Sequence, residues 1–233
     1  DIVLVCLPNV QTSREILLGS NGVIAHASKG QIIADHSTVD LATSRACSDA
    51  ATEKGAFFLD APISGGPTGA KEGSLSIMVG GDIAAFERAR PVFETMGSTV
   101  QKMGPSGAGT GMKLVNQLLV SVNVCAAAEA FHLANAAGLD IDLATEVLAV
   151  SWGQSRMAER SAPITAAQDF ENSGAPVRNL VKDIGIITTL SDDLGLSLPL
   201  SKAAELLIDE ANRFDPEYDI AGVIKMLEMR QPS

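Results

Sequence analysis

The pattern of the sequence changes at a glycine-rich segment, GPSGAGTG at 104–111, and this change strongly limits the possible folds. Before the segment, apolar runs typical of buried strands alternate with stretches of helical periodicity, which predicts βαβ units and a mostly parallel sheet. After it, residues 110–230 carry helical patterns and no convincing strand. We therefore expect an α/β domain over residues 1–105 and an all-α domain over residues 106–233.

Apolar runs and capping residues place the elements of the first part. Asp40 is expected to cap one helix and Gly55 to end it, while Pro91 is expected to interrupt or restart another. The chain opens inside an apolar run, IVLVCLP, so we expect it to be a fragment. Strands are expected at 2–7, 30–38, 56–63, 74–81 and 98–103, and helices near 11–18, 40–54 and 83–96.

Composition narrows the classes of function. A net charge of −11 argues against a nucleic-acid partner, which would need clustered Lys and Arg. No run reaches the roughly 18 apolar residues of a membrane span, so no membrane partner is expected. Cys6, Cys47 and Cys125 are widely spaced and the three histidines are isolated. We therefore expect buried thiols in a reducing compartment, no metal site and a cytoplasmic location, with organellar import left open.

One candidate site is the loop Ser64-Gly65-Gly66, which follows the strand expected at 56–63. The two glycines leave backbone N–H donors beside the Ser64 hydroxyl, at the carboxyl end of a strand, where open α/β sheets bind ligands. Such a loop can hold a small carboxylate. The same residues are common in turns, and here the chain is expected to continue through a hairpin. From the residues alone both interpretations stay open.

A second candidate site is the start of a long helix, expected from about residue 106 and running for more than twenty-five residues without Pro. Lys113 and Asn116 lie three residues apart on one face of this helix. Their neighbours are mostly Val, Leu and Ala, and burial would lower the pKa of the ammonium toward working pH, as suits a proton donor and acceptor. The spacing alone favours a solvated lysine, because most lysines are exposed.

Four motifs in order carry a resemblance to a known family. They are DAPISGG at 60–66, GSLSIMVGG at 73–81, GAGTGMKLVNQ at 107–117, and Lys182-Asp183-Ile-Gly. Over essentially the whole chain they resemble the β-hydroxyacid dehydrogenases, such as 3-hydroxyisobutyrate dehydrogenase and tartronate semialdehyde reductase. The resemblance implies the remainder of a Rossmann-type parallel sheet followed by an all-α domain. It also implies an NAD- or NADP-dependent oxidoreductase that acts on a small carboxylate as a homo-dimer or homo-tetramer.

The resemblance implies roles for the residues of both candidate sites. Lys113 matches the catalytic lysine of the family, and Asn116 matches the neighbour that orients the substrate. Ser64, Gly65 and Gly66 match the loop that binds the substrate carboxylate. In the reducing direction, hydride reaches a carbonyl β to the carboxylate, and Lys113 stabilises and protonates the carbonyl oxygen. No metal is needed.

Only some of the cofactor-binding residues that the resemblance implies are present in this sequence. Leu7 and Pro8 match a turn against the cofactor, Thr38 matches a contact to its nicotinamide end, and Lys182 matches a lysine of the C-terminal domain. The GxGxxG motif and the residue that distinguishes NAD from NADP are absent. GAGTGM at 107–112 mimics the motif, but it opens the long helix. We therefore expect an N-terminally truncated member that binds dinucleotide poorly and is inactive by itself.

Several alternatives remain. The sequence KLVNQ resembles the tartronate semialdehyde reductase branch more than the Lys-x-x-Asn-Asn of many 3-hydroxyisobutyrate dehydrogenases, which leaves the substrate open. A 6-phosphogluconate dehydrogenase would need a longer C-terminal domain and basic residues for a phosphate. Imine reductases replace the catalytic lysine. From a different class, a non-catalytic binding module derived from the same fold is the main alternative.

Overall fold

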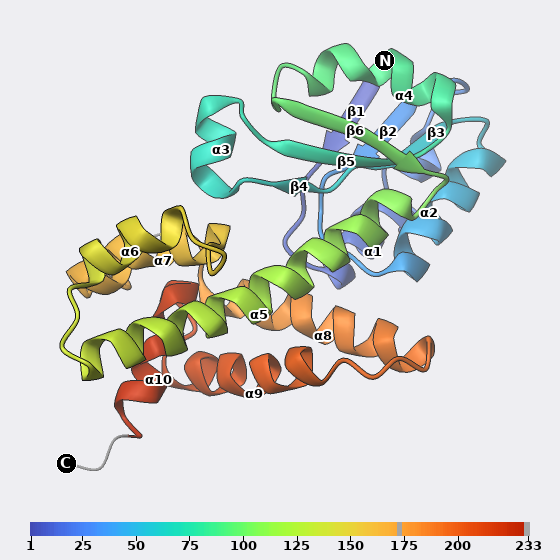
Figure 1. Cartoon of the computed structure of the whole chain (residues 1–233). Coiled ribbons are helices and arrows are strands. Elements are labelled where there is room, and N and C mark those ends of the chain that lie inside the picture. The colour runs from blue at the N-terminus through green and yellow to red at the C-terminus, as the bar shows by residue number, and fades with distance from the viewer. Residues whose placement is uncertain (172–173, 231–233) are drawn as a thin grey trace. The chain divides into compact units, whose positions relative to one another are not determined.

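The structure, a computed structural model, describes residues 1–171 and 174–230. It divides the chain into two compact units, residues 1–116 and 117–233 (Figure 1). The boundary lies inside the longest helix, α5 (Ala108–Ala136), later than the end of the α/β part suggested by the sequence pattern. The first turns of α5 therefore belong to unit 1 and the rest to unit 2.

Unit 1 is built on a six-stranded sheet with the order β1-β2-β3-β5-β4, in which β6 also pairs with β5. The first three strands are parallel, with Ile2 opposite Ile32 and Ile32 opposite Phe57. Strand β5 runs antiparallel to β3 and β4 and parallel to β6. The strands are β1 (Ile2–Val5), β2 (Ile32–Asp35), β3 (Phe57–Asp60), β4 (Ile63–Ser64), β5 (Ser76–Gly81) and β6 (Thr99–Gly104).

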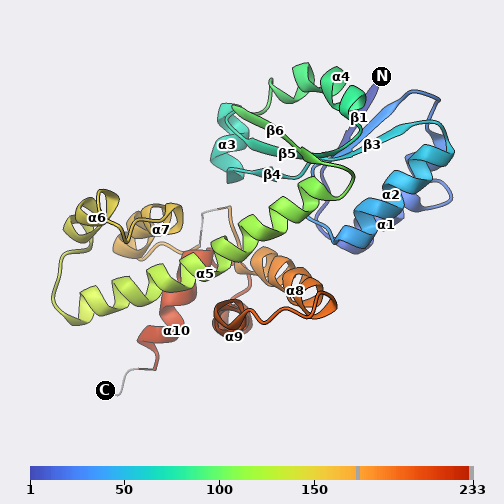
Figure 2. The same cartoon turned by 45° about the vertical axis from the view of Figure 1, so that its right-hand side comes forward.

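Helices cover both faces of this sheet (Figure 2). On one face α1 (Val10–Leu18) and α2 (Leu41–Glu53), with the short turn η1 (Ile24–His26), bury Leu17, Cys47 and Phe58. On the other face α4 (Ile83–Phe93) buries two phenylalanines against β2, β3 and β5. The α/β part predicted from the alternating pattern is thus confirmed.

Of the three residues expected to begin, end or interrupt a helix, two do so. Asp40 caps α2 by accepting a hydrogen bond from Thr43 N at 2.7 Å, and Gly55 follows the helix with φ of +68°. The exception is Pro91, which lies inside a continuous α4 and does not interrupt it. Its ring lies in an exposed position of the helix, so the missing N–H donor leaves no buried carbonyl group without a partner.

The hairpin expected after the Ser64-Gly65-Gly66 loop is present, because β4 and β5 pair antiparallel, but its connection contains a helix. A short helix, α3 (Gly66–Glu72), lies between β4 and β5. Gly65 and Gly66 have φ of +133° and +63°, conformations that L side chains rarely adopt, and they turn the chain sharply from strand into helix. Turn chemistry therefore explains both glycines, but it joins a strand to a helix here.

Strand β1 is the edge of the sheet, and this explains why one of the three cysteines is exposed. Leu4 is 39% exposed, whereas all four residues of β2 are buried. Cys6, which follows β1, is exposed, so the expectation of three buried thiols is wrong for this one. Cys47 and Cys125 are buried, and burial raises the pKa of each thiol to about 12.

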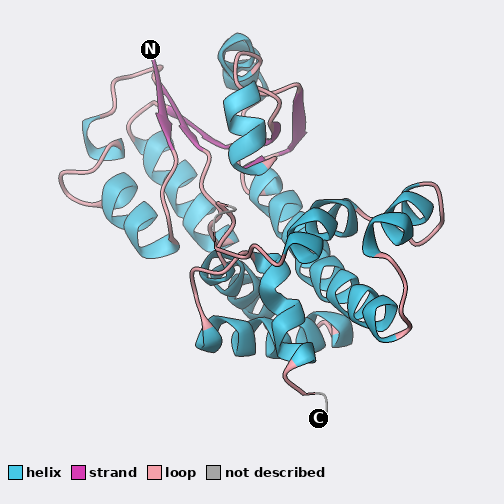
Figure 3. Ribbon diagram, turned by 90° about the vertical axis from the view of Figure 1, so that its left-hand side faces the viewer, coloured by secondary structure: helices cyan, strands magenta, loops and turns pink. Residues whose placement is uncertain are grey.

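Unit 2 is helical (Figure 3), and among its described residues the β contact present is one isolated bridge between Pro176 and Asp219. Its core packs the later turns of α5, with Phe131 at the centre, against Ile184 and Ile208. By length and composition α5 could cross a membrane, with a mean hydropathy of 1.4, but core helices pass the same test. The other elements are α6 (Ile141–Ala149), α7 (Arg156–Ala167), α8 (Val177–Asp193), α9 (Pro199–Phe214), η2 (Ile220–Val223) and α10 (Ile224–Glu228).

A buried ion pair ties unit 2 together. Arg160 on α7 donates to both oxygens of Asp219, at 2.8 and 2.5 Å, and the Asp219 side chain has no exposed surface. Asp219 also accepts from Ala221 N at 2.8 Å, and its own N–H donates to Phe170 O at 2.7 Å. One carboxylate thus holds α7 and η2 in place beside the segment that enters α8.

Candidate active site

The loops after β1 and β2 lie side by side at the carboxyl edge of the parallel strands, where a hydrogen bond joins them. Leu7 N donates to Ser37 Oγ at 2.8 Å, and Ser37 N donates to Asp35 Oδ1 at 2.9 Å. Pro8 is exposed there and Thr38 is half-buried. Because open α/β sheets bind ligands at this edge, Leu7, Pro8 and Thr38 are placed where a cofactor would be expected.

His36, in the same region, is a buried group that follows β2. It is 7% exposed, its Nδ1 lies 2.6 Å from Ala61 O, and its ring makes an edge contact with Phe93. Burial lowers the pKa of the imidazole, against the opposing effects of the Ala61 carbonyl and Asp35. A neutral His36 therefore donates from Nδ1 and links the end of β2 to the end of β3.

The Ser64-Gly65-Gly66 loop is accessible. Ser64 is half-buried at the end of β4, and both glycines are exposed. A Cβ at Gly66 would have no neighbour within 4 Å, whereas one at Gly65 would lie 3.2 Å from Leu75 Cδ2. The loop therefore offers a backbone surface that a small anion can approach.

Lys113 is buried, so the solvated lysine favoured by spacing alone is wrong. It is 7% exposed on the part of α5 that belongs to unit 1, and Asn116 on the same face is half-buried. A lysine is almost never this buried without a specific role or partner. The helical spacing placed Lys113 and Asn116 on one face, but it did not predict the burial of the lysine.

A carboxylate that the sequence did not single out holds the start of this helix. Asp60, at the end of β3, accepts from Gly107 N and Thr110 N, each at 2.8 Å. The Thr110 hydroxyl in turn lies 2.7 Å from Ser44 Oγ on α2. Burial raises the pKa of the Asp60 carboxyl, and the hydrogen bonds from Thr110 and Gly107 oppose this. Asp60 thus fixes the first turn of α5 on the sheet.

The segment at 107–112 does not form a phosphate-binding loop. A Cβ on Gly109 would lie 2.2 Å from Met78 O and 2.4 Å from Asp60 O, so this glycine faces the sheet at very close range. A phosphate-binding glycine must instead leave its backbone open to the ligand. The likeness of GAGTGM to a dinucleotide motif is therefore superficial, and the glycines serve helix-to-sheet packing.

Replacing Gly109 by alanine is expected to lower the free energy of unfolding by about 1–3 kcal/mol, because the added methyl group would overlap two backbone oxygens. Gly111 on the same helix is the matched control. Its Cβ would meet only Leu41 Cδ2, at 3.8 Å, so Gly111→Ala should be neutral or stabilising by up to about 1 kcal/mol. Urea unfolding of the two variants measures both values, and equal stabilities would contradict the close approach.

Lys182 lies in unit 2, whereas the other eight candidate residues lie in unit 1. Its Nζ is 3.0 Å from Asp183 Oδ1, and Gln117 Nε2 donates to Asp183 Oδ2 at 2.5 Å. The Asp183 carboxylate is therefore shared between α8 and α5. Gln117 is thus part of the surroundings of Lys182.

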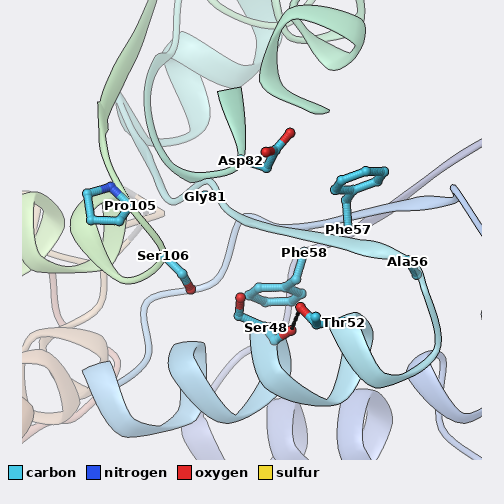
Figure 4. A pocket seen from close by; sticks show the side chains of 9 residues that line it. All are labelled: Ser48, Thr52, Ala56, Phe57, Phe58, Gly81, Asp82, Pro105 and Ser106. Atoms are coloured by element: carbon cyan, nitrogen blue, oxygen red, sulfur yellow. Dashed lines mark hydrogen bonds between the residues drawn. The ribbon is translucent and has the colours of Figure 1, made fainter. Parts of the chain in front are cut away.

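A separate hollow of about 270 Å³ lies in unit 1, and none of the nine candidate residues lines it (Figure 4). Ser48 and Thr52 of α2 form its floor, and Thr52 Oγ1 donates to Ser48 O at 2.8 Å. Asp82 on its rim already caps α4 through Ala85 N. Within residues 1–171 and 174–230, no group of three or more His, Cys, Asp and Glu side chains could hold a metal ion.

The residues at the carboxyl edge of β1 and β2 could bind one part of a nicotinamide dinucleotide. The loops after β1 and β2 lie at the ligand-binding edge of the sheet, and their backbone is held by the bond from Leu7 N to Ser37 Oγ. There Leu7 and Pro8 would lie against the cofactor, and Thr38 would contact its nicotinamide end. When bound, such a cofactor supplies or accepts the hydride.

Two family models cover the chain. Residues 1–104 match the NAD-binding domain of 6-phosphogluconate dehydrogenase, and residues 107–227 match the NAD-binding domain of NADP-dependent 3-hydroxyisobutyrate dehydrogenase. The two matches meet in the glycine-rich segment before α5.

Individual relatives agree with these models. The 2-hydroxy-3-oxopropionate reductase of Escherichia coli is 33% identical over 98% of this chain and 78% of its own length. The 3-hydroxyisobutyrate dehydrogenase of Pseudomonas aeruginosa is 33% identical over 94% and 76%. The crystal structure of a 3-hydroxyisobutyrate dehydrogenase from Salmonella typhimurium superposes with a TM-score of 0.87 at 30% identity, over 97% of this chain and 79% of that one. With its sheet, buried lysine and glycine loop, the chain belongs to the β-hydroxyacid dehydrogenase family of NAD(P)-dependent oxidoreductases.

Proposed function

We propose that this protein interconverts a small β-hydroxyacid and its semialdehyde or keto form, with Lys113 as proton donor and acceptor. The observation that carries the proposal is the burial of Lys113, 7% exposed, on a helix anchored in the unit that also holds the Ser64-Gly65-Gly66 loop. Two of the named relatives act on small hydroxyacids of this kind. NAD or NADP serves as the hydride carrier.

Each candidate residue then has a definite task. The Ser64 hydroxyl and the N–H groups of Gly65 and Gly66 bind the substrate carboxylate and thereby position the carbonyl. Asn116 orients the substrate from the same helix face as Lys113. In the reducing direction, Lys113 donates a proton to the carbonyl oxygen as negative charge develops there, and in the oxidising direction it accepts that proton.

On the cofactor side, Leu7 and Pro8 form a turn against the cofactor and Thr38 contacts its nicotinamide end, while Lys182 is a cofactor-binding candidate by the resemblance alone. The Lys182 ammonium has its charge partly balanced by Asp183, at 3.0 Å.

The direct test is an activity panel on the full-length polypeptide. Small β-hydroxyacids, including 3-hydroxyisobutyrate, and the semialdehyde 2-hydroxy-3-oxopropionate are assayed with the oxidised or reduced form of NAD and NADP, beside the methyl ester of each acid. We expect turnover of at least one acid and a much lower kcat/KM for its ester, because the loop would lose the carboxylate. If no acid reacts and calorimetry detects no dinucleotide binding, the protein is a non-catalytic module.

We also propose that the protein assembles as a homo-dimer or homo-tetramer in the cytoplasm. Exposed apolar side chains gather along α6 and just after it, and such patches mark protein–protein contacts. They are Leu143, Val147, Val150 and Trp152, each at least 62% exposed. Sedimentation velocity measures the assembly, and a monomer at all concentrations would contradict it.

The cytoplasmic location is proposed because three widely spaced cysteines suit a reducing compartment.

A further inference from the structure

The start of α5 is held by a side chain from another element. The first N–H groups of a helix have no partner inside it, and a nearby residue usually caps them. Here the cap comes from β3, because Asp60 Oδ1 accepts from Gly107 N and Oδ2 from Thr110 N. A carboxylate in this position is also favoured by the positive end of the helix dipole.

Asp60 and the first turn of α5 are closely packed against their neighbours. Asp60 is 1% exposed, and a Cβ on its strand partner Gly80 would lie 2.4 Å from Asp60 Oδ1. The helix approaches the sheet at Gly109, as described above. Ser44 fixes Thr110 from α2 through a hydrogen bond of 2.7 Å between their hydroxyl oxygens. The first turn of α5 is thus bound to β3, β5 and α2 with little freedom to shift.

The same carboxylate is linked along the chain to both parts of the candidate site. Four residues after Asp60 the chain reaches Ser64, where the glycine loop begins, and three residues after Thr110 the helix presents Lys113. The intervening Pro62 is itself fixed, because its carbonyl accepts from Met78 N at 3.0 Å. A shift of Asp60 would therefore change the separation of the loop and the lysine.

We propose that Asp60 is a positioning residue, which sets Lys113 relative to the substrate-binding loop by capping α5 from the strand that leads into that loop. The inference rests on the function proposed above for Lys113. Asp60 does not contact the reacting atoms and acts through the lysine. Both carboxylate oxygens are required, since an asparagine would turn its NH₂ group toward one of the two backbone donors.

The test is a double-mutant cycle of Asp60→Asn and Lys113→Ala in the full-length polypeptide, assayed with the best substrate of the panel. In the presence of Lys113, Asp60→Asn is expected to lower kcat about 10- to 100-fold, as misplacement by about 1 Å can. The Kd for the dinucleotide, measured by calorimetry, should stay within about twofold. In the Lys113→Ala background the same change should lower kcat less than about twofold, because the group that it positions is gone.

The outcomes separate the two proposals. Equal losses of kcat in both backgrounds would mean that Asp60 only supports the fold, which overturns the inference and leaves the role of Lys113 intact. Wild-type kcat in Lys113→Ala alone would instead refute the role proposed for the lysine.

A second variant keeps the test decisive if Asp60→Asn does not fold. Ser44→Ala leaves the carboxylate in place but removes the bond to the Thr110 hydroxyl. It should lower kcat about 2- to 10-fold when Lys113 is present and leave it within experimental error in the Lys113→Ala background. A loss of the same size in both backgrounds would overturn the inference.

Discussion

Lys113→Ala in the full-length polypeptide is expected to lower turnover by at least about a hundredfold, because a positioned proton donor contributes about 10²–10⁴ to a rate. The KM for the dinucleotide should change little, since the lysine is expected to contact the substrate side. Steady-state kinetics with the best substrate of the panel measures both. An effect on kcat alone would identify an interaction made in the transition state.

Two controls isolate the proton-transfer role. Lys113→Met retains an unbranched side chain of similar length in the buried position and should lose as much activity as the alanine variant, which excludes a packing effect. Lys54→Ala, at the exposed end of α2, should keep wild-type kinetics. Lys113→Met with near-normal turnover would show that the lysine matters only for packing.

Asp219→Ala is expected to lower the free energy of unfolding by about 3–5 kcal/mol, because breaking a buried ion pair leaves an uncompensated charge. The Arg160 side chain is only 31% exposed, so its guanidinium cannot recover full hydration. The backbone N–H of Ala221 would also lose its acceptor. Urea unfolding followed by circular dichroism of the helical signal measures the loss.

The matched control lies two residues away in the chain. Glu217 pairs with Arg178, but both side chains are largely exposed, at 67% and 49%. Exposed pairs contribute about 0–1 kcal/mol, so Glu217→Ala should remain within that range. Similar losses in the two variants would show that burial does not distinguish these ion pairs.

Local sequence patterns predicted much of the fold for a physical reason. Caps and apolar periodicity act over a few residues, and Asp40 and Gly55 bound α2 as expected. The loop between β4 and β5 was predicted less completely. Gly65 and Gly66 indicated a change of direction, and β5 does return antiparallel to β4, but no local pattern indicated the short helix between them.

The candidate site was likewise predicted only in part from the sequence. The order of motifs in the sequence was enough to name Lys113, Asn116 and the glycine loop. It could not give the burial of Lys113, which is 7% exposed in the folded chain. It also gave no sign of Asp60 as a cap, because its partners lie 47 and 50 residues away along the chain.

By itself the sequence determined an α/β part followed by helices, and the types of residue available for chemistry on a small carboxylate. Periodicity, caps and glycine conformations are local, so they can be read from neighbouring residues. Only the tertiary structure decided that the lysine is buried, that a distant aspartate holds its helix, and that the glycine-rich segment serves packing. These properties come from close contacts between segments far apart in the chain, and no local pattern encodes them.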